Sequence, residues 1–347
     1  VGLRLEALDL RRHPVGRRGW QAKRGGDRAK GSAFVPFEQG FKQIQHPVAR
    51  CGSTGHSLFP ITMWEEAAAG NCRLSASAIG VAGEWREGMH DHEQTAAALR
   101  AAYHSGSIAP LRDALDPADA TGAYAVQAIN TRFWSDAGRR IVGRKVGLTA
   151  KAVQAQLGVE QPDFGVLFDD MAIAHGGRLD PGRTLQPKVE AEIAIVLATD
   201  LDDVNATAAT VAAAVRHAVA AIEIVDSRIA DWKITFADTV ADNGSSAFFV
   251  LGDAPKPLAG LDLYTCGMVM EINGAVASIG VGAACLGHPL EAAAWLARTL
   301  AAAGDPLRAG DVVLTGALGP MVALTPGDRV EAKIGGLGGA SFHYEKD

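Results

Sequence analysis

The chain has 347 residues, of which 48% are hydrophobic and 21% charged, and its formal net charge is −6. This composition is typical of a soluble globular protein, and the negative charge argues against nonspecific nucleic-acid binding. The sequence contains no charge-free apolar stretch of about 18 residues, so it predicts no transmembrane helix. The cysteines are scattered without a metal-type Cys-x-x-Cys pair and predict reduced thiols of a cytoplasmic protein. They are Cys51, Cys72, Cys266 and Cys285.

Residues 1–88 differ from the rest of the chain because they are basic, with 13 Lys and Arg against 8 Asp and Glu, and lack sustained periodicity. They do not form a secretory signal, since no apolar core follows the basic residues. A transit peptide would normally be shorter and free of a pair such as Glu65-Glu66, and a basic interaction arm is a third interpretation. We favour a fourth, in which residues 1–88 are a disordered or non-native upstream extension and Met89 is the natural start.

The next segment has a helical pattern. Residues 92–103 are strong helix formers. Residues 117–134 predict a second helix, with Asp116 as its N-cap and Pro117 as its first helical residue. We therefore expect a helical cap over about residues 89–140, at the start of a single catalytic domain that spans 89–347.

From residue 141 the pattern changes to short strands with a few helices. We expect a strand at 141–148, a helix at 151–157 capped by Thr149, a turn at 161–165 and a strand at 188–197. An alanine-rich helix at 203–220, with Asn205 or Thr207 near its cap, should lead into a strand around Glu223. Later strands are expected at 247–251, 266–272, 275–279, 311–314, 329–334 and 340–344, with one helix at 289–303. Asn273-Gly274 is a strong hairpin signal. The fold class is therefore α+β, with a helical N-terminal part and a β-rich body over about 141–347.

Two carboxylates lie two residues apart inside the apolar strand 187–197. Because strand side chains alternate between faces, Glu190 and Glu192 point the same way, roughly 7 Å apart. Glu223 lies in a second apolar strand. A Glu-x-Glu pair most often lies on a solvated edge, but these flanks are too apolar for that. The three glutamates therefore predict an all-oxygen site for Mg²⁺ or Mn²⁺, with a buried pair between Glu223 and Arg228 as the alternative.

Lys145 lies between apolar residues and glycines, and two interpretations remain open for it. Partial desolvation would lower its pKa and suit it to proton transfer or anion binding. Alternatively, it is a surface lysine whose stem lies along apolar neighbours. Asp163 follows Pro162, and an Asp in such a turn is usually structural.

Several long motifs, in the same order, resemble the hydratase/decarboxylase branch of the fumarylacetoacetate hydrolase superfamily. The resemblance covers roughly Met89 to the C-terminus and none of residues 1–88. One departure is Gly244, where the family pattern has alanine, and glycine should loosen the backbone there. The motifs are residues 143–149, 156–165, 187–192, 221–229, 238–246 and 316–320.

The resemblance implies a fumarylacetoacetase-like body of mixed rolled sheets and a metal-dependent lyase. The implied reaction adds water to 2-hydroxypenta-2,4-dienoate, giving 4-hydroxy-2-oxopentanoate, in the meta-cleavage degradation of aromatic compounds. The alternatives are decarboxylation of 4-oxalocrotonate and hydration of a longer 2-hydroxy-2,4-dienoate. A catalytically silent partner is a further reading, against which the intact glutamate triad argues.

The resemblance also implies roles for individual residues. Glu190, Glu192 and Glu223 would hold the metal. Lys145 and Asp163 would form an acid/base pair, and for Asp163 this role depends on the resemblance alone.

Two further expectations concern the substrate and the assembly. The hydroxyls of Ser245 and Ser246 either hold the substrate carboxylate or cap a turn. His288 is expected to begin a helix. The family implies a symmetric homo-oligomer, with a possible complex with a related decarboxylase or the next enzyme of the pathway.

Overall fold

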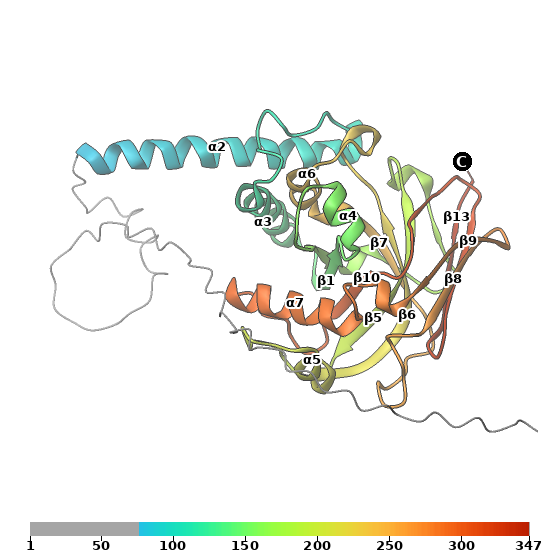
Figure 1. The fold of residues 1–347 in the computed structure, drawn as a ribbon. Coiled ribbons are helices and arrows are strands. Elements are labelled where there is room, and N and C mark those ends of the chain that lie inside the picture. Colours follow the sequence, from blue (N-terminus) through green and yellow to red (C-terminus); the bar gives the residue numbers. More distant parts are fainter. Residues whose placement is uncertain (1–75, 347) are drawn as a thin grey trace, which may run out of the picture. The chain divides into compact units, whose positions relative to one another are not determined.

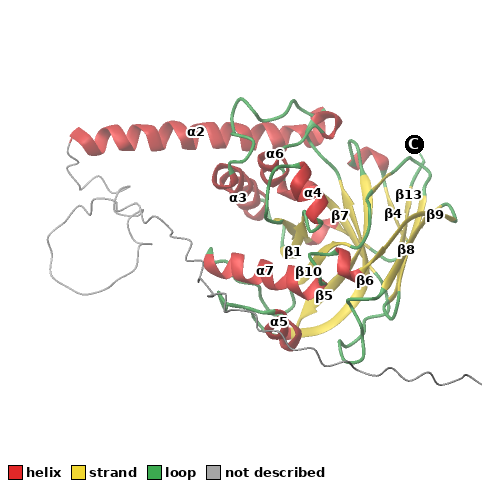
Figure 2. Cartoon of the chain, viewed as in Figure 1, coloured by secondary structure: helices red, strands yellow, loops and turns green. Residues whose placement is uncertain are grey.

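The computed structural model describes residues 76–346, with the backbone alone for 76–90, and the expectations for residues 1–75 lie outside it. The α-helices of this part are α2 (Ala76–Ser105), α3 (Ala120–Asp136), α4 (Lys151–Gln156), α5 (Ala208–Ala214), α6 (Phe236–Ala241) and α7 (Pro289–Ala302). Short 3₁₀ turns are η1 (Asp169–Met171), η2 (Pro181–Arg183), η3 (Ala230–Trp232), η4 (Asn243–Ser245) and η5 (Gly282–Ala284). Figure 2 shows that the strands gather in one body with helices around it, as the α+β prediction requires.

The strands form two mixed sheets. One is an eight-stranded sheet in the order β2-β1-β10-β5-β6-β7-β3, with β11 paired to β5, and the other is a five-stranded sheet in the order β4-β13-β12-β8-β9. The first sheet contains β1 (Ile141–Gly147), β2 (Asp163–Phe168), β3 (Ala172–Ile173), β5 (Lys188–Leu197), β6 (Val215–Val225), β7 (Ser246–Leu251), β10 (Val312–Ala317) and β11 (Val322–Ala323). The second contains β4 (Gly177–Leu179), β8 (Gly267–Ile272), β9 (Ala275–Val281), β12 (Arg329–Ile334) and β13 (Gly338–Tyr344).

The two sheets pack together over a shared apolar core. Strands β12 and β13 contact β6, β8 contacts β5, and α7 packs on β10 and α5 (Figure 1). The alternate residues Val189, Ala191, Ile193, Ile195 and Leu197 of β5 all lie in this core. Period-2 alternation therefore places the glutamates of β5 on the opposite face, as predicted.

The N-terminal helices have a core of their own. Helix α2 packs on α3, and α3 packs on α6. Their contact buries Leu99, Val126, Phe236 and Val240. Helix α2 contains the predicted helix 92–103 and runs through residue 89 without interruption.

The predicted helix 203–220 is wrong over its second half. Helix α5 ends at Ala214, and residues 215–225 form β6 instead. Alanine favours helix intrinsically, but here the segment pairs with β5 and buries Ala218 and Ala220 in the core. Thr207 caps α5 by accepting a hydrogen bond from the Thr210 amide, as expected.

Three other local predictions are also wrong. The expected turn at 161–165 is wrong from Asp163 onward, where β2 begins and pairs antiparallel with β1. Helix α3 is capped by Asp119, because Asp116 already accepts a hydrogen bond from Ala118 in the turn before the helix. Helix α4 begins without a side-chain cap, because the Thr149 side chain packs against Gly316 instead.

Two other local predictions, a hairpin and the start of a helix, are confirmed. Asn273-Gly274 joins β8 to β9, and both residues have positive φ, at 56° and 80°. His288 caps α7 by accepting a hydrogen bond from the Leu290 amide.

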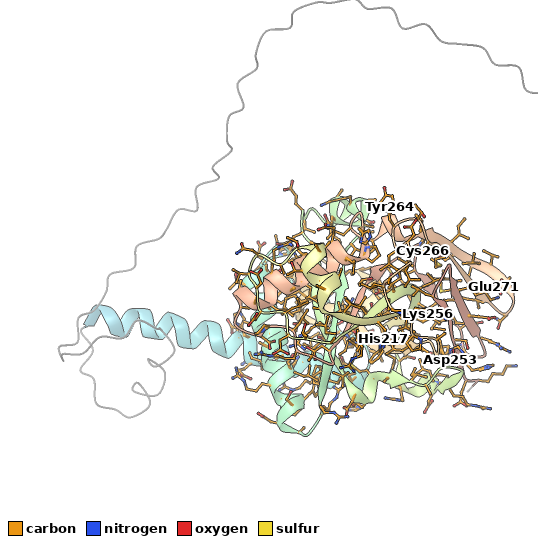
Figure 3. The ribbon with its side chains drawn as sticks, turned by 90° about the horizontal axis from the view of Figure 1, so that it is seen from below. His217, Asp253, Lys256, Tyr264, Cys266 and Glu271 are labelled. Atoms are coloured by element: carbon orange, nitrogen blue, oxygen red, sulfur yellow. The ribbon has the colours of Figure 1, made fainter. Side chains whose placement is uncertain are left out.

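Near the start of β6, Ala218 forms an isolated β-bridge with Lys256, which Figure 3 labels near His217. Within the described part, no helix is both long and apolar enough to cross a membrane.

Candidate active site and metal centre

The register between β5 and β6 brings three glutamates together. Glu190 pairs directly with Glu223 across the two strands, and Glu192 pairs with Ala221. Since residues paired across neighbouring strands point to the same face, all three carboxylates face one another. One oxygen from each lies within 4.8 Å of the others, and this is the one such carboxylate group found in the described part of the chain.

The carboxylates lack enough protein donors to be satisfied without a further cation. Glu192 Oε2 accepts the Gly316 amide at 2.7 Å, but Glu192 Oε1 and both oxygens of Glu223 have no hydrogen-bond donor among the described residues. Glu192 and Glu223 are both fully buried. Buried, orphaned carboxylate oxygens in one cluster are the donor set that a hard divalent cation requires, so the residues fit a metal.

The alternative prediction, a buried ion pair between Glu223 and Arg228, is wrong. Arg228 instead pairs with Asp242, with Nε 2.5 Å from Oδ1. This buried pair supports the loop that leads to the serines: the Arg228 amide donates to Asp242 Oδ2, and Nη2 donates to the Asp242 carbonyl. The cation beside Glu223 is Lys145.

Lys145 projects from β1 toward the glutamates. Its Nζ lies 3.4 Å from Glu223 Oε1, and its side chain is only 3% exposed, which excludes the surface interpretation. The expected lowering of its pKa is also wrong. Burial does lower the pKa of Lys145, but Glu223, Asp163 and the other two glutamates raise it by more, so the net pKa is raised. Lys145 therefore remains a cation near neutral pH.

Asp163 lies opposite Gly147, at the start of β2, which brings it close to Lys145. Burial raises the pKa of Asp163, against the opposing charge of Lys145. Its Oδ1 has no hydrogen-bond donor in the described part of the structure. A carboxyl group with a raised pKa and a free oxygen is suited to carry a proton.

The glutamates also titrate abnormally. Burial and the charge of Glu223 raise the pKa of Glu190 to about 7. Burial, together with the charges of Glu223 and Glu190, raises the pKa of Glu192 well above its usual range. The cluster therefore binds protons when no metal neutralises it.

These shifts predict the pH dependence of the metal-free protein. The pKa of Glu190 lies at about 7 in the folded chain against 4.5 ordinarily, so between these values the folded state binds more protons and its stability falls as pH rises. Glu190→Gln removes this contribution. In chelator, we expect its melting temperature, relative to the parent chain, to increase by about 5 °C between pH 5 and pH 7.5. A difference that stays constant over this range would contradict the account.

Lys145, Asp163 and Glu190 line one cavity of about 360 Å³, called here the first cavity. Away from these groups its wall is mostly apolar. The lining includes Leu148, Val153, Val225, Trp232, Ile234, Ala284, Ala317, Pro320 and Met321. A small organic acid fits such a site, with its polar end at the carboxylates and its carbon chain against the apolar wall.

The two candidate serines have different positions. Ser245 lines the first cavity, and its hydroxyl lies 3.2 Å from that of Thr239. Ser246 is buried behind it, where its hydroxyl has no partner among the described residues. Gly244, which directly precedes Ser245, has φ +61°, and a Cβ there would lie 2.9 Å from Lys145 Cε. Glycine thus provides both the left-handed backbone and room for the lysine.

Gly147 is a site residue that the sequence motifs contained without revealing its role. A Cβ at this position would lie 2.1 Å from Asp163 Oδ1 and 3.2 Å from Lys145 Nζ. Gly316 is another, because its amide holds Glu192. Both lie in the family motifs, but nothing in the sequence shows that they approach Asp163 and Glu192.

Replacing Gly147 by alanine is expected to displace Asp163 while preserving the fold. We expect kcat to fall by about 10²-fold, at the lower end of the usual contribution of a general acid or base. Gly267→Ala is the matched control, because a Cβ at that strand glycine meets nothing within 4 Å. Turnover of Gly147→Ala equal to that of Gly267→Ala would contradict the placement of Asp163 in the reaction.

Comparison with known proteins agrees with this site. The family model "Fumarylacetoacetate (FAA) hydrolase C-terminal" matches residues 140–343. The chain belongs to the fumarylacetoacetate hydrolase family. This match covers the two sheets and all of the candidate site residues.

Named relatives cover most of the chain. It is 57% identical over 250 residues to 2-keto-4-pentenoate hydratase 1 of Dechloromonas aromatica (strain RCB), covering 72% of this chain and 95% of the relative. It is 43% identical over 249 residues to 2-hydroxyhexa-2,4-dienoate hydratase of Comamonas testosteroni, covering 71% and 93%. Identity at this level over nearly the whole of its relatives makes this family member a lyase of the hydratase type.

A solved structure shares the fold. 4-Oxalocrotonate decarboxylase from Pseudomonas putida G7, complexed with magnesium and adipate, superposes with a TM-score of 0.69 at 34% identity, covering 79% of this chain and all of that chain. A second structure of that decarboxylase contains calcium and acetate. The predicted fumarylacetoacetase-like body is therefore confirmed.

Proposed function

We propose that the protein adds water to 2-hydroxypenta-2,4-dienoate, the enol form of 2-keto-4-pentenoate, to give 4-hydroxy-2-oxopentanoate. The observation that carries this proposal is that Lys145, Asp163 and Glu190 line one mostly apolar cavity, with the orphaned oxygens of Glu192 and Glu223 next to Glu190. The identity to named 2-keto-4-pentenoate hydratases supports the substrate. The place of the reaction would be the meta-cleavage degradation of aromatic compounds.

Glu190, Glu192 and Glu223 would hold the divalent cation, which we propose to be Mg²⁺ or Mn²⁺. All of their ligand atoms are oxygens, which favours a hard cation. When bound there, the cation supplies Lewis-acid polarisation of the substrate's C2 oxygen. The magnesium and calcium of the decarboxylase structures support the same class of ion.

The protein's own side chains bind the substrate and transfer the protons. Lys145, as a buried cation, binds the anionic substrate and offsets the charge of the glutamates. Asp163 in its protonated form donates to C5, while the 2-hydroxyl gives its proton to bulk water, which yields a conjugated 2-oxo-3-enoate. The Asp163 carboxylate next accepts a proton from the water that adds at C4 and passes it to C3. A proton from bulk water restores Asp163.

The cavity favours this reaction over decarboxylation of a diacid. Lys145 is the one cationic residue among the described residues that line it, and it lies at the glutamate end. A second carboxylate on the substrate would find no further cationic partner among the described residues that line the cavity. Burying an unpaired carboxylate is costly, so a substrate with one carboxylate fits better.

The test compares the two substrates directly. We expect kcat/KM for 2-hydroxypenta-2,4-dienoate to exceed that for 2-oxohex-3-enedioate by at least about 10²-fold, the effect of about 3 kcal/mol. The products are identified by chromatography, since both reactions consume a conjugated chromophore. Release of CO₂ from the diacid with equal or higher kcat/KM would assign the protein to decarboxylation instead.

We also propose that residues 89–347 are the catalytic domain and that it works in the cytoplasm as a homo-oligomer. The family match over residues 140–343 and the coverage of the hydratase relatives support this domain assignment. A complex with a related decarboxylase or the next enzyme of the pathway remains a proposal from the family.

A further inference from the structure

A second cavity of about 360 Å³ lies outside the candidate active site and shares no lining residue with it. Its wall comes from the end of α2, the end of α3, the η1 and η2 turns, and the segments around β6 and β7. Four arginines line it, in a chain whose formal net charge is −6. They are Arg100, Arg139, Arg183 and Arg228.

Two of these guanidinium groups have no carboxylate partner among the described residues. Arg100 donates to the amide oxygen of Asn130 and stacks on Phe133. Arg183 lies over the ring of Phe248 and reaches the Asp170 carbonyl at 3.4 Å. Most of the donors of both groups therefore remain available to a ligand.

The other two arginines are paired, but one of them is incompletely satisfied. Arg139 pairs with Asp170 at 2.8 Å. Arg228 is 1% exposed and pairs with Asp242, yet its Nη1 has no acceptor in the described part of the chain. A buried guanidinium nitrogen without an acceptor is rare, because its desolvation is costly unless an acceptor arrives.

The carboxylates around the second cavity do not neutralise the charge of its four arginines. Of its lining residues only Asp170 and Asp226 are acidic, and Asp226 already accepts the backbone amides of Leu185 and Gln186. Asp242 does not line the cavity but pairs with Arg228. Counting it, three carboxylates stand against four arginines. Excess guanidinium groups around a concave site favour an anion, which they bind through charge-assisted, often bidentate hydrogen bonds.

We propose that this second cavity is a binding site for a small organic anion with a carboxylate or phosphate group. The anion would lie between Arg100 and Arg183, with Arg228 at the base of the cavity. The cavity is larger than an inorganic ion, and the rings of Trp134 and Phe248 in its wall provide apolar surface for the body of the ligand.

The site adjoins the active-site loop. Gly244 and Ser245 line the first cavity, whereas Ala247 and Phe248 line the second. One short segment therefore forms a wall of both. Arg228 holds this segment through Asp242 and the Ser246 carbonyl, so an anion bound to Arg228 would contact a residue that fixes the wall shared by the two cavities.

The test is calorimetric titration of the full chain with inorganic phosphate and, separately, with succinate. Bound metal is first removed with chelator, so that the uncompensated glutamates of the first cavity repel anions. The chelator is then dialysed away, because a polycarboxylate would compete for the proposed site. We expect saturable binding of at least one probe, and the stronger probe identifies the anion class. In Arg100→Gln and Arg183→Gln the dissociation constant should rise at least about tenfold, and added salt should weaken binding. Arg178→Gln, at an exposed arginine paired with Glu345, is the matched control and should bind as the parent does.

Two results would overturn the proposal. One is the absence of saturable binding of both probes by the parent chain. The other is equal binding by the parent, Arg100→Gln and Arg183→Gln. Neither readout uses turnover, so both results are independent of the proposed hydratase activity.

Discussion

Replacing Glu192 by glutamine is expected to abolish metal-dependent turnover while preserving the fold. The substitution keeps the shape of a side chain that is fully buried, but removes one of three anionic ligands. Losing the charge stabilisation of a bound cation costs several kcal/mol in the transition state, so kcat/KM should fall by about 10³-fold or more. The measurement is turnover over a range of Mg²⁺ concentrations.

Glu192→Gln should lower activity but raise the stability of the metal-free protein. Without metal, the three carboxylates repel one another, so Glu192→Gln should melt at a higher temperature than the parent in chelator and gain less from added Mg²⁺. Glu331→Gln, at a half-exposed glutamate of β12, is the matched control and should leave both quantities unchanged. A Glu192→Gln protein with the parent's turnover and the parent's response to Mg²⁺ would contradict the metal site.

Replacing Lys145 by methionine is expected to lower kcat by about 10²- to 10⁴-fold, the usual contribution of a positioned acid, base or charge in a reaction of this kind. Methionine fills much of the same buried space but cannot offset the glutamates or hold an anionic substrate. Because Nζ lies 3.4 Å from Glu223, the variant should lose stability in chelator and recover part of it with Mg²⁺.

Lys151→Met is the matched control for this experiment. Lys151 begins α4, is exposed, and pairs only with Gln154 among the described residues. Its replacement should leave kcat and KM unchanged. Near-parental turnover of Lys145→Met would remove Lys145 from the chemistry, whatever its effect on stability.

Local pattern was sufficient to single out the three glutamates that we propose as metal ligands. Period-2 alternation placed Glu190 and Glu192 on one face of β5, and the apolar flanks indicated burial. The direct pairing of Glu190 with Glu223 depends on the register of two strands distant in sequence, which no local pattern determines. The three glutamates were therefore predicted, but their convergence required the fold.

The positions of Lys145 and Asp163, the proposed acid/base pair, could not be predicted from local sequence. Lys145 reaches the glutamates because β1 lies beside β10, which lies beside β5, an order set by tertiary packing. Neither interpretation of Lys145 gave the direction of its pKa shift, because the sequence suggested burial but did not show the surrounding carboxylates that raise the pKa. Asp163 was expected in a turn and lies at the start of a strand that pairs with β1.

Alanine-rich sequence was the main source of error in the fold. Residues 203–220 carry a strong intrinsic preference for helix, yet β6 takes Val215–Val225 because β5 and β7 pair on both sides of it. The caps at Thr207 and His288 and the Asn273-Gly274 hairpin were predictable, whereas the cap predictions for Asp116 and Thr149 were wrong. Most of the expected strands, such as 141–148 and 188–197, are present, but the order in which they pair was not predictable.

The most direct test of the central claim is turnover of 2-hydroxypenta-2,4-dienoate by protein stripped with chelator and then supplied with Mg²⁺ or Mn²⁺, with the product identified. The account predicts no turnover in the stripped protein. On addition of the cation, loss of the dienol absorbance should be restored, with 4-hydroxy-2-oxopentanoate formed in equal amount. Equal turnover before and after the cation is added would contradict a metal-dependent hydratase built on Glu190, Glu192 and Glu223.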